Sequence, residues 1–99
     1  MTATLTTLST VRFRPGRTVI TPGALDALAK AEQHPGDFFK RHLSGDWGEL
    51  CDEDITANEQ ALVSGLRLLS AYRTSRGQRI WIITEADRSA TTILLPEEY

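Results

Sequence analysis

The chain has 99 residues, of which 40% are hydrophobic and 24% are charged, and its formal net charge is −2. These values are typical of one small globular domain, so we predict a single domain over residues 1–99. The mild acidity argues against a protein that coats nucleic acid. No apolar run approaches the roughly 20 residues of a membrane span, and a single cysteine cannot form an intramolecular disulfide. We therefore expect a cytoplasmic protein without membrane contact.

The N-terminal segment predicts an arm followed by a hairpin. Residues 1–9 are rich in threonine and carry few apolar side chains, which indicates a loose arm or a weak edge strand. Apolar residues alternate with arginine over 11–14, Pro15-Gly16 supplies a turn, and an apolar pair ends the run 17–20. This pattern predicts a β-hairpin over residues 11–20.

Three helices are expected in the middle of the chain. A Thr-Pro pair opens the first, over about 21–33, because threonine caps free N–H groups and proline fits the first helical position. A second, short helix is predicted from about residue 37 to 43. The third is predicted over 56–64, where a threonine and a glutamate match a capping box. The acidic stretch 46–54 between them reads as a loop.

The C-terminal third predicts three strands. Residues 66–72 fit either a helix or a strand, and the helix-breaking Gly65 favours the strand. A turn at 75–77 leads into the apolar run 79–84, which predicts a central strand covered on both faces. Residues 91–95 form the next strand. The sequence therefore predicts an α+β fold: an antiparallel sheet with a C-terminal three-stranded meander, and two to three helices packed on one face.

The first candidate site is the loop from His42 to Gly48, which concentrates polar and aromatic residues between glycines. In a functional interpretation, Asp46 and Trp47 form a binding loop in which the indole anchors a partner. In a structural interpretation, Trp47 covers the core and Asp46 satisfies N–H groups of the loop. The structural interpretation is favoured, because turns recruit these residue types for backbone reasons.

The second candidate site is the turn between the last two predicted strands, where Glu85, Asp87 and Arg88 stand close together in the sequence. Polar loops held between core strands often carry function, so these three residues are candidate binding residues. The alternative is an Asp–Arg pair and Ser/Thr hydrogen bonds that only stiffen the turn.

Other chemistry finds little support. The acidic and histidine-containing stretch 34–54 lacks every common spacing of metal ligands, so no metal and no cofactor are expected. Three arginines surround the Pro15-Gly16 turn and form a small positive patch. Contact with nucleic acid through this patch is an option but is not favoured, because exposed arginines more often serve solubility.

One string of residues extends over most of the chain after Thr21: His42-x2-Gly45-Asp46-Trp47-Gly48, Asn58, Gly65-x-Arg67-Leu68-Leu69-Ser70-Ala71-Tyr72, Trp81-Ile82-Ile83-Thr84-Glu85-Ala86-Asp87-Arg88-Ser89, Thr91-Thr92 and Leu95-Pro96. The string resembles a family of short bacterial proteins that are carried on plasmids and integrative elements and are known as plasmid-related proteins. The resemblance implies a setting in mobile bacterial DNA. It implies no chemistry.

Two functions stay open. The first is an accessory protein of mobile elements that binds an unidentified host or element-encoded protein, with a homodimer through an edge strand as a further option. The second follows from a fold-level resemblance to RelE-type toxins and barnase-like ribonucleases. In that case His42, Arg67, Tyr72 and Arg88 would be catalytic and should converge on one electropositive sheet face.

Overall fold

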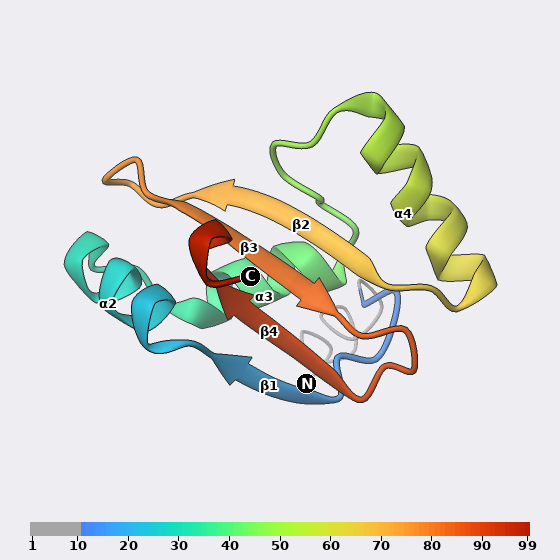
Figure 1. Ribbon diagram of the computed structural model, residues 1–99, viewed down its shortest axis with the longest axis horizontal. Coiled ribbons are helices and arrows are strands. Elements are labelled where there is room, and N and C mark those ends of the chain that lie inside the picture. Colours follow the sequence, from blue (N-terminus) through green and yellow to red (C-terminus); the bar gives the residue numbers. More distant parts are fainter. Residues whose placement is uncertain (1–10) are drawn as a thin grey trace, which may run out of the picture.

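A computed structural model describes residues 11–99 and has the predicted α+β architecture (Figure 1). The arm predicted at 1–9 lies outside the described residues. No helix in the described part is both long and apolar enough to cross a membrane. In chain order, the elements are β1 (Arg17–Ile20), α2 (Pro22–Ala31), α3 (Pro35–Leu43), α4 (Asp52–Ser64), β2 (Leu68–Arg73), β3 (Arg79–Thr84), β4 (Ala90–Leu94) and a 3₁₀ turn, η1 (Pro96–Glu98).

The four strands form one sheet in the order β1-β4-β3-β2. The predicted C-terminal meander is present, because β3 is antiparallel to both β2 and β4. The strand predicted for 66–72 is confirmed as β2. The expectation of a purely antiparallel sheet is wrong, since β1 runs parallel to β4 with Arg17 opposite Ala90. The sheet is therefore mixed.

The hairpin predicted over residues 11–20 is also wrong. The N–H of Arg12 donates to the Leu43 carbonyl at 2.8 Å, and the Arg12 guanidinium donates to Glu59 at 2.8 and 3.0 Å. These contacts tie the segment before β1 to the C-terminal end of α3 and to the middle of α4 rather than to β1. Gly16 has a φ of +66°, and an added Cβ would lie 2.4 Å from the Ser89 carbonyl oxygen. This close approach directs the chain from the turn into its pairing with β4.

One face of the sheet is packed against α2 and α3, and Figure 1 shows α3 behind β3 and β4, with α2 at the left of the sheet. Alternate strand residues point to this face and are almost completely buried: Tyr72, Ile80, Ile82 and Ile93, packed on Ala24, Leu28 and Phe38 of the helices. Among residues 11–99, η1 and the C-terminal residue lie on the opposite face. On this face Ile83 is buried whereas Trp81 is partly exposed, so the prediction that β3 is covered on both faces holds for part of the strand.

The helices begin where local caps are available. Thr21 caps α2 through a 3.2 Å bond from the Ala24 N–H, as the Thr-Pro signal predicts. Helix α3 starts two residues earlier than predicted, because His34 Nδ1 accepts from the Gly36 N–H at 2.9 Å and Pro35 occupies the first helical position.

Helix α4 begins at Asp52 rather than at residue 56, so most of the predicted acidic loop is helical. Three carboxylates, those of Asp52, Glu53 and Asp54, fall in its first turn, where they interact favourably with the helix dipole. The predicted capping box is not used. Glu59 instead bonds to Arg12 and to the Trp47 indole, at 2.8–3.0 Å.

The outer edge of β2 is closed by the segment before α4. The Ala71 N–H donates to the Trp47 carbonyl at 3.1 Å, and the Glu49 N–H donates to the Ala71 carbonyl at 2.6 Å. Gly48 lies between them with a φ of +76°, and an added Cβ would be 2.0 Å from the Ala71 oxygen. Only glycine permits this approach. Backbone groups that would otherwise stay unpaired on an edge strand are thereby satisfied.

Candidate functional site

The most polar part of the interior is a chain of hydrogen bonds that starts at His42, in the last turn of α3. His42 is 0% exposed. Its Nδ1 bonds to Ser70 Oγ at 2.6 Å and its Nε2 to Thr84 Oγ1 at 2.8 Å. Thr84 continues to Thr91 at 2.8 Å, and Thr91 donates to the Pro15 carbonyl at 2.7 Å. This network joins α3, the three meander strands and the segment before β1.

Burial lowers the pKa of His42 to about 4. The imidazole is therefore neutral at neutral pH, so one ring nitrogen donates and the other accepts. Phe13 and Trp47 pack edge-on against the ring, at centroid distances of 5.2 and 5.7 Å. A histidine with both nitrogens occupied and no exposed surface is a poor proton acceptor for an external substrate. Its contacts are those of a structural residue.

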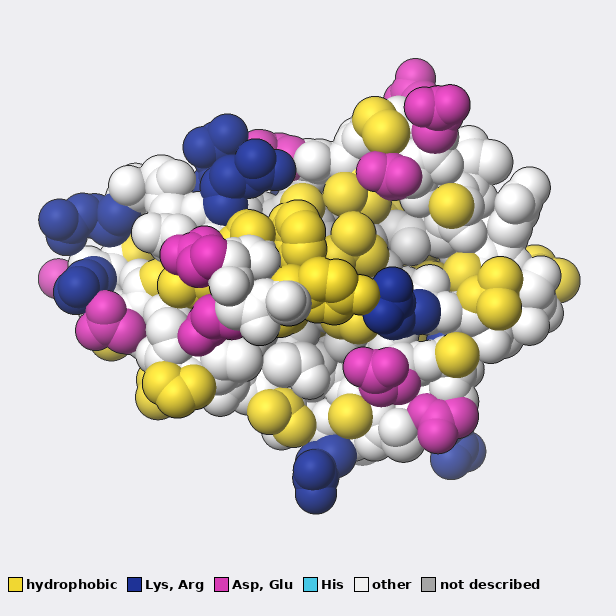
Figure 2. Space-filling model, viewed as in Figure 1, with side chains coloured by type: hydrophobic (Ala, Val, Ile, Leu, Met, Phe, Trp, Pro, Cys, Tyr) yellow, Lys and Arg dark blue, Asp and Glu magenta, His cyan; other side chains and the backbone are white. Residues whose placement is uncertain are grey.

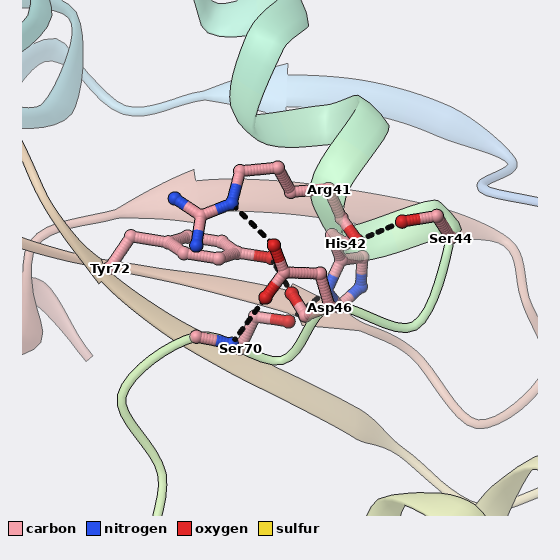
Figure 3. Close-up of polar contacts among 7 residues, drawn as sticks. Arg41, His42, Ser44, Asp46, Ser70 and Tyr72 are labelled. Carbon is pink, nitrogen blue, oxygen red and sulfur yellow. Dashed lines mark hydrogen bonds and ion pairs between the residues drawn. The ribbon is translucent and has the colours of Figure 1, made fainter.

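The predicted site residue Asp46 organises the loop after α3, as Figure 3 shows. Its carboxylate accepts from Arg41 Nε at 2.7 Å and from the Gly48 N–H at 3.2 Å, while its carbonyl accepts from the Tyr72 hydroxyl at 2.5 Å. The Arg41 hydrogen bond is the main reason that the pKa of Asp46 is lowered. The Arg41 guanidinium also lies 4.4 Å from the Tyr72 ring centroid.

The second residue of this predicted loop, Trp47, is buried with 4% of its surface exposed. Its indole N–H donates to Glu59 at 3.0 Å, and its ring stacks on Phe13 at 6.2 Å. Glu59 is also bonded to Arg12, and mainly for that reason its pKa is lowered to about 2. Trp47 thus covers part of the core, which agrees with the structural interpretation and leaves little indole surface for a partner.

The predicted turn at 85–89 is likewise engaged internally. Arg88 has a φ of +61°, and its guanidinium donates to the carbonyls of Leu66 at 2.7 Å and Ala61 at 3.1 Å. It therefore satisfies carbonyls at and just beyond the C-terminus of α4. Asp87 accepts from the Ser89 N–H at 3.0 Å, and its hydrogen bonds to Ser89 lower its pKa. Glu85 is exposed, with its backbone N–H bonded to Ala90.

The four residues expected to converge in a ribonuclease do not meet. His42 is buried beneath the helix-covered face, and Tyr72 points to the same face with its hydroxyl bonded to the Asp46 carbonyl. Burial raises the pKa of Tyr72 to about 12. Arg88 binds the end of α4, whereas the Arg67 guanidinium lies over Tyr99, 5.5 Å from its centroid, on the opposite face. The predicted electropositive catalytic face is not formed by these residues.

The face without helices carries residues that the sequence reasoning did not single out. Trp81 and Tyr99 pack edge-to-face at 5.8 Å with an interplanar angle of 67°. Tyr99 is 65% exposed. We call this surface the open face. Its residues are the partly exposed strand residues Val19, Leu69, Trp81 and Thr92, the exposed strand residues Arg17, Arg73 and Arg79, and Arg67 and Tyr99. Figure 2 shows its apolar centre, with basic and acidic side chains around it.

The register of β3 is the signal that would have revealed this surface. Ile80 and Ile82 point to the helices, so Trp81 between them must point the other way. The prediction that residues 79–84 are covered on both faces takes no account of this alternation of side chains.

Other candidate features are weaker. A cavity of about 220 Å³ lies between α2 and the β2–β3 turn, but Lys30 there pairs with Asp26 at 3.0 Å and its carbonyl accepts from Arg76. Within residues 11–99, no three His, Cys, Asp or Glu side chains come together as a group that could hold a metal ion.

No family model, curated protein or solved structure matches this chain. The plasmid-related family named from the residue string stays a prediction.

Proposed function

We propose that this protein is a non-enzymatic binding module that recognises another protein through the open face. The observation that carries the proposal is the Trp81–Tyr99 pair, with Arg67 stacked on Tyr99, on the sheet face opposite α2 and α3. Tryptophan, tyrosine and arginine are the residues most enriched among those that dominate binding energy at protein interfaces. We include in the proposal a link to mobile elements, which rests only on the resemblance to plasmid-related proteins.

The residues beneath and beside the open face hold its side chains in place, which suits a binding surface. Ile83 and Leu94 lie beneath it, 6% and 7% exposed, and provide a packed apolar base. Glu98 fixes the segment that carries Tyr99: it accepts from Thr21 Oγ1 at 2.5 Å and from the Gly23 N–H at 3.2 Å. Side chains that are held in place before binding lose less conformational entropy when a partner arrives.

The residues of the two predicted polar loops also favour the open face as the binding surface. Asp46, Trp47 and Arg88 each have internal partners, so they favour a structural assignment over a direct contact with another molecule. The ribonuclease alternative gains no support, because His42 and Tyr72 are buried and Arg67 and Arg88 contact different parts of the domain. An accessory protein that binds another protein needs neither a catalytic group nor a cofactor.

Site-specific photo-crosslinking tests the proposal. A benzoylphenylalanine is placed at Thr92 on the open face and, as a control, at Val63, which is 88% exposed on α4. In the natural host we expect a discrete protein adduct from position 92 that is lost in Trp81→Ala and is not formed from position 63. Equal adducts from both positions, or no adduct from position 92, would contradict the proposal.

A further inference from the structure

The charged strand positions of the open face are all arginine. Strand register places Arg17 of β1, Arg73 of β2 and Arg79 of β3 on this face, and Arg67 just before β2 extends the series. We infer that the partner is a protein whose contact surface places carboxylates around an apolar centre. This inference rests on the proposed function and names the chemistry of the partner.

The arginines of the open face differ in pairing from other arginines of the chain. Arg12 and Arg41 each form an ion pair with a carboxylate of the same molecule. On the open face only Arg73 does so, with Glu49 at 3.0 Å. Among the described residues, no carboxylate pairs with Arg17, Arg67 or Arg79. Residues 1–10 contain no Asp or Glu, so they cannot supply one.

One pair of these arginines opposes the stability of the sheet. Arg73 and Arg79 are directly opposite each other on the antiparallel strands β2 and β3. Like charges at such positions are unfavourable, and Glu49 neutralises only the first. A partner carboxylate beside Arg79 would remove this repulsion. It would also form charge-assisted hydrogen bonds with a guanidinium that has no internal acid.

The overall charge of the chain does not explain why arginines gather on the open face. The chain has 13 acidic and 11 basic residues, so an excess of arginine is not expected on any particular surface by composition. Acidic side chains also lie around the apolar centre (Figure 2), and Glu98 of η1 is already bonded to Thr21 and Gly23. The arginines without an internal carboxylate would steer an acidic partner to one orientation and speed its association. The apolar centre, Trp81 and Tyr99, would then provide most of the affinity.

A protein fits this surface better than a nucleic acid. Bases bind single-strand readers by stacking on open aromatic ring faces. Here Trp81 and Tyr99 contact each other edge-to-face, and the Arg67 guanidinium covers the Tyr99 ring. The partly exposed aliphatic side chains Val19 and Leu69 are suited to apolar protein side chains and offer nothing to phosphate.

Charge reversal in the crosslinking experiment tests the inference. Arg79→Glu and Arg67→Glu are each introduced into the chain with benzoylphenylalanine at position 92. Arg14→Glu, an equal charge change at an exposed arginine that precedes β1, is the matched control. We expect each open-face reversal to reduce the protein adduct by about tenfold, a usual size for the loss of one interfacial ion pair, and the control to leave it unchanged.

The outcomes separate the two proposals. If the adduct forms and is insensitive to Arg79→Glu and Arg67→Glu, the binding function stands and the acidic partner is wrong. If the crosslinked molecule is a nucleic acid, the proposal that the partner is a protein is wrong, and so is the inference that it is acidic. If position 92 yields no adduct, both proposals fall.

A second measurement uses defined probes with the purified chain. We expect a fluorescent peptide alternating valine and glutamate to bind more tightly than one alternating valine and lysine, with an affinity that falls as salt is added. Preference for the lysine peptide, equal binding of both, or tighter binding of a thymidine oligonucleotide would overturn the inference.

Discussion

The side-chain amide of Asn58 pairs with both backbone polar groups of Leu69. Its Nδ2 donates to the Leu69 carbonyl at 2.6 Å, and its Oδ1 accepts from the Leu69 N–H at 3.1 Å. The amide thus replaces the missing neighbour strand at this point of β2 and fixes α4 against the sheet edge. Asn58 is 5% exposed, so water does not compete freely for these bonds.

We predict that Asn58→Asp destabilises the fold by about 2–3 kcal/mol, because a carboxylate oxygen would face the Leu69 carbonyl and leave it without a donor. Urea unfolding measures the free energy. Gln60→Ala, on the exposed side of the same helix, is the control and should change it by less than about 0.5 kcal/mol. Equal effects of the two changes would refute the structural role of Asn58.

His42 should make stability depend on pH. Its pKa is about 4 in the folded chain, against 6.5 for a free histidine side chain. The unfolded chain therefore binds a proton first as pH falls, and stability decreases from about pH 6.5 towards pH 4, by about 3 kcal/mol in total. Above pH 6.5 the histidine is neutral in both states and contributes no slope.

Unfolding curves at several pH values measure this effect, and His42→Leu isolates it. The variant should be less stable at pH 7, because the Ser70 and Thr84 hydroxyls lose their partner. It should also lack the histidine part of the slope between pH 4 and 6.5. A variant with an unchanged slope would show that His42 is not the titrating group.

Two glycines provide a matched pair for the tight crossing at the β2 edge. Gly48 and Gly65 both have positive φ values, +76° and +73°, but a Cβ at Gly48 would meet the Ala71 oxygen whereas one at Gly65 meets nothing within 4 Å. Gly65→Ala should cost about 1 kcal/mol from backbone conformation alone. Gly48→Ala should cost at least about 2 kcal/mol more, because the edge must move. Similar unfolding free energies would contradict the close approach.

Arg88 should act on α4 and not on binding. Arg88→Ala removes the guanidinium that binds the Ala61 and Leu66 carbonyls. We expect faster amide hydrogen exchange in the last turn of α4 and a loss of about 1–2 kcal/mol of stability. Arg14→Ala, at an exposed arginine, should leave exchange unchanged. If Arg88→Ala left α4 exchange unaltered and abolished partner binding, the functional interpretation of the 85–89 turn would be restored.

The sequence predicts what is encoded locally. The Thr21 cap, the strand after Gly65 and the C-terminal meander all depend on neighbouring residues, and all three are observed. The parallel pairing of β1 with β4 depends on contacts between the two ends of the domain, which no local pattern records. Cys51, the N-cap of α4, makes no side-chain capping bond, so no local capping signal marks the start of this helix.

The site predictions were limited by the same dependence on tertiary structure. His42, Trp47 and Arg88 have residue types that suit chemistry, and only the fold shows that their polar atoms are bonded internally. The open face is spread over four strands and the C-terminal residue. Its arginines become neighbours only when the sheet forms.

We assign partner binding to the open face and not to the polar loops. The adduct yield from benzoylphenylalanine at Thr92, compared between Trp81→Ala and Arg88→Ala, distinguishes the two. We expect Trp81→Ala to abolish the adduct while the folded fraction stays high, and Arg88→Ala to lower the adduct only as far as it lowers the folded fraction. An adduct that survives Trp81→Ala and disappears in fully folded Arg88→Ala would instead place binding at the polar 85–89 turn.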